Sequence, residues 1–147
     1  MSLRNRLSEV GQSIAFLADP LAFFGRVLLS AFFLNEGHDQ IVNFADTMSY
    51  MEGFRVSPHL LPLVIIAEIG GGLMVLTGLF ARPAAIVLAG LCLLTALFFH
   101  RGFDDADQVI HFQKNVTMAG GFLMLAAHGA GAWSLDALIG RRRRPPQ

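Results

Sequence analysis

Long apolar stretches are the feature that most constrains what this chain can fold into. Four of them occur within 147 residues, and together they hold only two charged side chains, Arg26 and Glu68. They cover residues 20–35, 60–81, 84–99 and 116–135. A helix needs about 20 residues to cross a bilayer core, and backbone groups in lipid must be hydrogen-bonded within their own segment. The sequence therefore predicts an all-α integral membrane protein, folded as a four-helix antiparallel bundle.

Composition favours this membrane protein over a helical bundle in water, a soluble enzyme or a disulfide-stapled secreted domain. Charged residues make up 15% of the chain, whereas soluble domains average about 25%. The single cysteine, Cys92, excludes an internal disulfide and a cysteine-based zinc site. The 11 basic and 11 acidic residues cancel, which argues against a nucleic-acid partner.

The five histidines do not predict a metal site. No two of them are three or four residues apart, and the zinc motif His-Glu-x-x-His is absent from the sequence. The alternative is a site assembled across loops from His38, His100 and His111. Isolated histidines near a membrane interface are the more common case, and we therefore expect no bound metal.

The chain divides into three predicted parts. Residues 1–19 form an amphipathic helix that lies in the membrane interface, because apolar residues recur there at spacings of three and four. These apolar residues are Leu3, Leu7, Val10, Ile14 and Leu17. A cleaved signal peptide fits less well, because the apolar run that follows begins far from the arginines. Residues 20–140 form the membrane domain, with polar loops at 36–59 and 101–113, and residues 141–147 form a basic tail.

Positive charges are distributed unevenly between the two sides of the predicted bundle. The link Ala81–Pro83 is so short that the second and third stretches must run antiparallel, and alternation then assigns each loop to a side. Seven arginines fall on the side of the chain ends, and three basic residues fall on the other side. The seven are Arg4, Arg6, Arg82 and Arg141–Arg144, and the three are Arg55, Arg101 and Lys114. Because basic segments stay in the cytoplasm, we expect both termini to be cytoplasmic.

Polar residues within or beside the predicted membrane helices are the candidates for a functional site, because such residues are costly in lipid. Helix rise places several at a similar depth near the outer face, which predicts an outward-facing pocket. These are Glu36, His38, Glu68, His100 and the group at 111–115. Glu68 and His100 are the candidate catalytic residues. The candidate binding residues are Arg26, Asn35, Glu36, His38, Lys114, Asn115 and His128.

Glu68 has two interpretations. As a functional group it accepts a proton, or a hydrogen bond from a polar ligand. As a structural group it holds two helices in register. In both cases we expect its side chain to point into the bundle and to be satisfied by Asn35, Lys114 or Asn115. For Arg26 we favour a structural role, because its long side chain can place the guanidinium near the lipid headgroups.

Glycines indicate where helices approach each other. Gly70–Gly72 and Gly120–Gly121 remove side chains from the second and fourth stretches, and we expect them at helix contacts. His128 shares a helix face with Lys114 and Gly121, so this face is predicted to line the interior of the bundle.

Several segments, taken in order, resemble one family. They are Gly25-Arg26-Val27-Leu28-Leu29, Asn35-Glu36-Gly37-His38, Glu68-Ile69-Gly70-Gly71-Gly72, Ala81-Arg82-Pro83, His100, Gly129-Ala130-Gly131 and Ser134-Leu135-Asp136. Over most of residues 20–140 the chain resembles the DoxX family of small four-helix bacterial membrane proteins. The resemblance implies a multi-pass protein of the bacterial plasma (inner) membrane. It also implies oxidoreductase activity linked to thiosulfate oxidation, with quinone as electron acceptor, or a role beside membrane or soluble redox partners.

Two positions depart from the family pattern. Gln40 stands where members often carry lysine, and Ala132-Trp133 stands where they often carry arginine. Both changes remove a cation near a membrane face, which argues against functions that require an anion to bind there.

Three functions are compatible with these residues. The first is a quinone-linked oxidoreductase or redox-complex subunit with a polar pocket around Glu68, in which quinone or a partner's cofactor carries the electrons. The second is a non-catalytic scaffold that recruits or stabilises a partner enzyme, favoured by the basic tail and the amphipathic N-terminus. The third is a small-solute or proton pathway along Arg26, Glu68 and His128, which needs a homo-oligomer because four helices form too narrow a bundle. The lipid bilayer is a partner in every case.

The charge distribution makes a prediction about topology. Reporter fusions at both chain ends should read cytoplasmic, and fusions in the loops around Asp46 and Asp105 should read external, because basic segments are retained inside. The opposite pattern of reporter activity would overturn the orientation.

Overall fold

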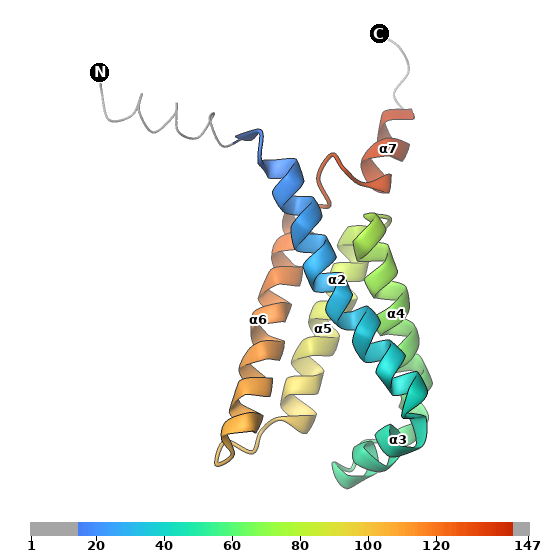
Figure 1. Ribbon diagram of the computed structural model, residues 1–147, viewed down its shortest axis with the longest axis vertical. Helices are drawn as coiled ribbons and strands as arrows, with labels where there is room; N and C mark the ends of the chain where they lie inside the picture. Colours follow the sequence, from blue (N-terminus) through green and yellow to red (C-terminus); the bar gives the residue numbers. More distant parts are fainter. Residues whose placement is uncertain (1–14, 143–147) are drawn as a thin grey trace, which may run out of the picture.

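The computed structural model describes residues 15–142, and every regular element in this range is a helix (Figure 1). The elements are α2 (Ala18–Val42), α3 (Phe44–Gly53), η1 (Pro58–Leu60), α4 (Leu61–Thr77), α5 (Ala81–Phe99), α6 (Ala106–His128) and α7 (Leu135–Arg142). The all-α class is thus confirmed for the described residues. Most of the predicted interfacial helix 1–19, and residues 143–147 of the predicted tail, lie outside them.

Three helices in the described range are long and apolar enough to cross a membrane. They are Ala18–Val42, Pro58–Thr77 and Ala81–Phe99. They contain the first and third predicted stretches and most of the second, which was predicted to continue to residue 81 but ends at Thr77. The first stretch continues beyond its predicted end at Asn35, and much of the predicted loop 36–59 is helical in α2 and α3. The prediction of a loop there was wrong because α2 continues past Asn35, where Gly37 packs against Ile69 of α4 and Glu36 and Gln40 line a cavity.

The fourth predicted stretch differs from α6 at both ends. The helix begins at Ala106, where the Asp105 carboxylate accepts a hydrogen bond from the Asp107 N–H at 2.9 Å and caps the first turn. It ends at His128 and not at Leu135, because Gly129 and Gly131 adopt φ angles of 85° and 77° that turn the chain. The first half of α6 is therefore more polar than the predicted span.

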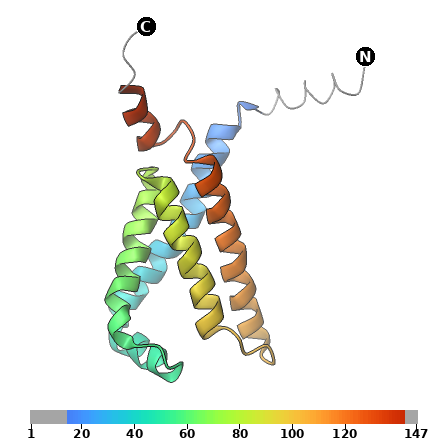
Figure 2. The ribbon, with the colours of Figure 1, turned by 180° about the vertical axis from the view of Figure 1, so that it is seen from behind.

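The helices pack in two pairs that α4 and α5 join together. α2 lies along α4 and α5 lies along α6, as Figures 1 and 2 show from opposite sides. α4 and α5 form the expected antiparallel hairpin through Gly78–Phe80, where Gly78 has a φ of 69°. Phe33, Leu88 and Phe122 lie in the buried core, and the rings of Phe33 and Phe122 meet edge to face at 5.3 Å.

The glycine prediction holds for part of each cluster. A Cβ atom at Gly71 would lie 3.0 Å from the Leu88 side chain of α5, and one at Gly72 would lie 3.2 Å from Leu34 of α2. Gly121 faces Leu29 in the same way at 3.5 Å. Gly70 and Gly120 face open space instead, because neighbouring residues of a helix point about 100° apart.

A buried arginine ties three segments together at the end of the molecule where α7 lies, which we call the α7 end. Arg26 is only 1% exposed. Its Nη1 donates to the carbonyl oxygens of Val75 at 3.1 Å and Leu76 at 2.7 Å, in the last turn of α4. Its Nη2 donates to the carbonyl oxygen of Trp133, between α6 and α7. Arg26 thus satisfies carbonyl groups that a helix end leaves unpaired.

Two aspartates complete this arrangement. Asp19 accepts a hydrogen bond from the Ala132 N–H at 2.7 Å, which holds the α6–α7 connection against α2. Asp136 accepts from the N–H groups of Phe80 at 2.9 Å and Ala81 at 3.1 Å, and so caps the start of α5. We call Asp19, Arg26 and Asp136 the polar lock.

The glycine contacts predict a difference between two substitutions in α2. Gly37→Ala should lower the thermal unfolding temperature in detergent, because the new Cβ would lie 2.6 Å from Ile69 Cγ1 of α4. Gly25→Ala should leave it unchanged or raise it, because no atom lies within 4 Å of that Cβ and alanine favours a helix by about 1 kcal/mol. Equal effects of the two variants would contradict the close α2–α4 contact.

The polar lock predicts that Arg26 acts through hydrogen bonds and not through charge alone. Arg26→Lys should lower the unfolding temperature clearly, because one ammonium group cannot reach carbonyls on two separate segments. Each buried acceptor left unpaired costs about 1–3 kcal/mol. Arg101→Lys, at an exposed position, is the matched control and should have no effect. If Arg26→Lys is as stable as the wild type, the lock does not hold the helices together.

Candidate functional site

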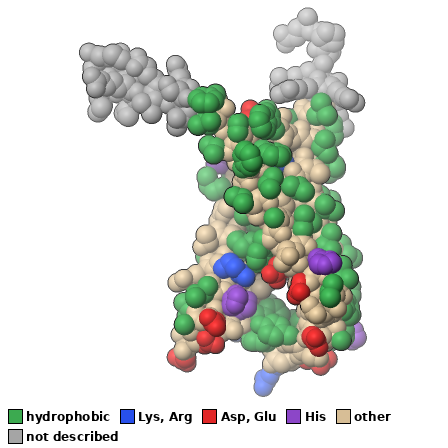
Figure 3. Space-filling view, in the orientation of Figure 1, with side chains coloured by type: hydrophobic (Ala, Val, Ile, Leu, Met, Phe, Trp, Pro, Cys, Tyr) green, Lys and Arg blue, Asp and Glu red, His purple; other side chains and the backbone are tan. Residues whose placement is uncertain are grey.

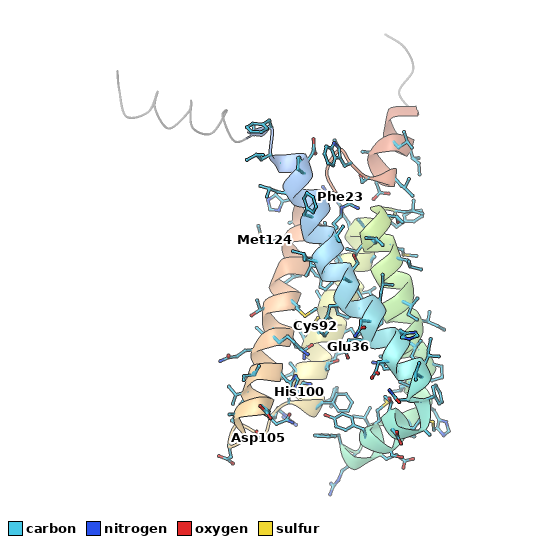
Figure 4. All side chains as sticks on the ribbon, in the orientation of Figure 1. Phe23, Glu36, Cys92, His100, Asp105 and Met124 are labelled. Carbon is cyan, nitrogen blue, oxygen red and sulfur yellow. The ribbon has the colours of Figure 1, made fainter. Side chains whose placement is uncertain are left out.

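A cavity of about 490 Å³ opens at the opposite end of the molecule, which we call the α3 end. All four long helices and α3 contribute to its walls. Figure 3 shows the hollow in the lower half of the molecule, with charged and histidine side chains on both sides of it. Glu36 on α2, Cys92 on α5 and His100, which directly follows α5, are labelled in Figure 4 and line this cavity.

The acidic wall comes from α2 and α4. Glu36, Asp39 and Gln40 lie on one face of α2 because they are spaced three and four residues apart. Glu68 of α4 is 7% exposed and completes this wall. The two helices approach closely at Gly37, where an added Cβ would lie 3.4 Å from the Glu68 Cβ. The packing that buries Gly37 therefore also brings the carboxylates of α2 and α4 to one wall.

The basic wall comes from α5 and α6. His100 follows the last residue of α5, and its Nδ1 is 2.9 Å from Oε1 of Gln108. The imidazole rings of His100 and His111 stack with their centroids 5.1 Å apart. The Lys114 Nζ lies 4.7 Å from the centroid of the Phe32 ring, a cation–π contact.

Aromatic side chains line part of the cavity at the α3 end. Tyr50 of α3 stacks on Phe99 of α5 with the ring centroids 5.6 Å apart, and Phe54 meets the edge of Phe99 at 5.4 Å. Partial burial raises the pKa of the Tyr50 hydroxyl above its ordinary value, at which the group is already protonated and able to donate a hydrogen bond at neutral pH. Phe98 and Leu94 continue the apolar surface on α5.

Glu68 points into the cavity region but lacks the partner that the sequence predicted. Its buried Oε2 has no hydrogen-bond partner, and neither has the buried Oε1 of Gln40. Asn115 instead donates to the His111 carbonyl oxygen of its own helix at 3.0 Å. Asn35 is exposed, and Lys114 is engaged with Phe32. The predicted satisfaction of Glu68 by Asn35, Lys114 or Asn115 was therefore wrong.

The structure brings together five of the predicted site residues and separates the other four. The five that line the cavity are Glu36, Glu68, His100, Lys114 and Asn115. Asn35 and His38 are exposed on the outer side of α2, and Arg26 belongs to the polar lock. His128 is exposed and lies beside Arg26 at a separate hollow of about 240 Å³, so its predicted place inside the bundle with Lys114 was wrong.

Several cavity residues were missed by sequence reasoning. Tyr50 lay in a segment predicted to be a loop, and Gln108 preceded the predicted fourth stretch. Gln40 could have been found from its spacing of four residues from Glu36. Within residues 15–142 no group of three or more His, Cys, Asp and Glu side chains is arranged to hold a metal ion. His38 lies on the exposed side of α2 and does not line the cavity, whereas His100 and His111 do.

Comparisons with known proteins identify the family. The DoxX family model matches residues 21–101. The chain is 41% identical to inner membrane protein YqjF of Escherichia coli over 126 residues, which are 86% of this chain and 97% of that protein. It is 32% identical to inner membrane protein YphA of the same organism, over 79% of this chain and 88% of that protein. No solved structure matches the chain. The chain therefore belongs to the DoxX family, as its ordered motifs predicted.

Proposed function

We propose that this chain is a multi-pass protein of the bacterial inner membrane that binds a quinone head group in its cavity. It acts in a membrane redox reaction, either as a quinone-linked oxidoreductase or as a subunit of a redox complex. The observation that carries this proposal is a buried carboxylate, Glu68, in a cavity with aromatic walls. Ionisable groups at membrane depth usually mark a functional site.

The proposed membrane arrangement is a bundle of four crossing helices, with α6 as the fourth. Four polar residues of α6 line the cavity, namely Gln108, His111, Lys114 and Asn115. Its exposed residues include Ile110 and Leu123, which suit contact with lipid. The polar composition of α6 is thus compatible with a crossing, because much of that polarity is turned toward the cavity.

The proposed orientation follows from the charges in the sequence. Both termini are cytoplasmic, residues 1–19 lie along the interface, and the basic tail contacts anionic headgroups. The cavity at the α3 end then opens toward the periplasm.

The cavity fits a flat, mostly apolar ring with polar atoms at two ends. Its volume of about 490 Å³ lies within the range of about 300–1,000 Å³ that is typical of small-molecule sites. Aromatic residues from α2, α3 and α5 would enclose the ring, while Lys114 and Glu68 lie on opposite walls. When bound, a quinone supplies electron-accepting chemistry that amino-acid side chains lack.

The protein's own groups would bind the ring and manage protons. Lys114 donates a hydrogen bond from the basic wall, and Glu68 accepts one, or a proton, from the other side. His100 is held by Gln108 through Nδ1, so its Nε2 is the nitrogen left to hold or release a proton. The proton-pathway alternative has less support, because Arg26 and His128 border a different hollow from Glu68.

The test measures quinone binding to the full-length protein in lipid nanodiscs. A short-chain alkyl benzoquinone should bind saturably and raise the unfolding temperature. Thr95→Trp should weaken this binding by at least about tenfold, because residue 95 lines the cavity. Leu97→Trp, on the exposed side of the same helix, is the matched control and should bind like the wild type. Absence of saturable binding to the wild type would reject the proposal and favour the scaffold alternative.

A further inference from the structure

Two buried oxygen atoms on the acidic wall of the cavity have no hydrogen-bond partner. They are Oε2 of Glu68 and Oε1 of Gln40. Both residues line the cavity, and Glu68 is 7% exposed. A buried acceptor without a partner is unfavourable and rare, and it is expected to have a role. A carboxylate oxygen and an amide oxygen have one need in common, which is a hydrogen-bond donor.

The opposite wall has the reverse character. Lys114 carries donors and no acceptor, and Asn115 already uses its amide N–H on the His111 carbonyl. The cavity thus presents donors from α6 on one side and unpaired acceptors from α2 and α4 on the other. A ligand that spans the cavity needs an acceptor at one end and a donor at the other.

This polarity distinguishes the two redox forms of a quinone. The oxidised form carries two carbonyl oxygens, and reduction by two electrons and two protons converts both to hydroxyl groups. A carbonyl is suited to the basic wall, but against Glu68 it would leave the buried carboxylate oxygen unpaired. A hydroxyl both donates and accepts, and therefore suits either wall.

We infer that the buried, unpaired carboxylate oxygen of Glu68 makes the cavity select the reduced, hydroxyl-bearing form of its ring ligand. This inference rests on the proposed quinone site and adds the redox form that the site prefers. Tighter binding of the reduced form raises the reduction potential of the bound couple. For a two-electron couple, tenfold tighter binding corresponds to about 30 mV. The bound ring would then be a stronger electron acceptor than the free one.

The experiment compares dissociation constants for a short-chain alkyl benzoquinone and for its quinol, measured anaerobically by equilibrium dialysis against nanodiscs that hold the full-length protein. The wild type should bind the quinol at least about tenfold more tightly. Glu68→Gln should lose most of this preference, because the new amide can donate to a carbonyl. Asp46→Asn removes an exposed carboxylate of α3 that does not line the cavity, and it should keep the full preference.

The outcomes separate this inference from the proposed function. Equal affinities of the wild type for both forms would overturn the selectivity and leave the quinone site in place. This result is expected if the Gln40 amide is turned over so that its nitrogen donates to Glu68. Binding of neither form would overturn the proposed function itself. An unchanged preference in a folded Glu68→Gln protein, checked by its unfolding temperature, would also reject the role of Glu68.

Discussion

The burial of one guanidinium group determines how the rest of this structure can be arranged. Arg26 is surrounded by protein, and a buried charge is unfavourable unless polar groups surround it. Its partners are carbonyl oxygens of the last turn of α4 and of the connection after α6. The carbonyls of Val75 and Leu76 lie at the negative end of the α4 dipole, which stabilises a cation there. At the start of α5 the charges are reversed: the negative Asp136 carboxylate lies at the positive N-terminal end of the helix and accepts hydrogen bonds from its N–H groups.

The position of this polar lock accounts for the position of the cavity. Hydrogen bonds gather α2, α4, α5 and the α6–α7 connection at the α7 end, whereas α2 and α6 make few contacts with each other. The helices diverge toward the α3 end, as Figures 1 and 2 show. The cavity lies where they have separated, and α3 with its aromatic residues closes part of it. The hydrogen-bonded packing at the α7 end and the cavity at the α3 end are therefore two results of one helix arrangement.

Opposite charges lie on facing walls of this cavity without cancelling each other. The Lys114 ammonium group lies over the Phe32 ring, and the buried Glu68 Oε2 has no hydrogen-bond partner. Charged groups interact strongly in a region of low dielectric, so a polarity persists across the cavity. A cavity of this kind suits a ligand with different polar groups at its two ends, which is the basis of both proposals made above. The same walls carry Glu36 and Asp39, which would repel a small anion.

The amino-acid sequence by itself determined the helical class, the first three membrane-length stretches, the family and the depth of the polar residues along each helix. These properties follow from local composition and from a fixed rise per residue. Only the tertiary structure decided which of those residues meet. Asn35, Glu36 and His38 lie at nearly the same depth, yet only Glu36 lines the cavity, because each step along a helix turns the side chain by about 100°. Which direction faces inward depends on close contacts such as Gly37 against Ile69 and on the distant carbonyls that hold Arg26, and these bring together residues far apart in the chain.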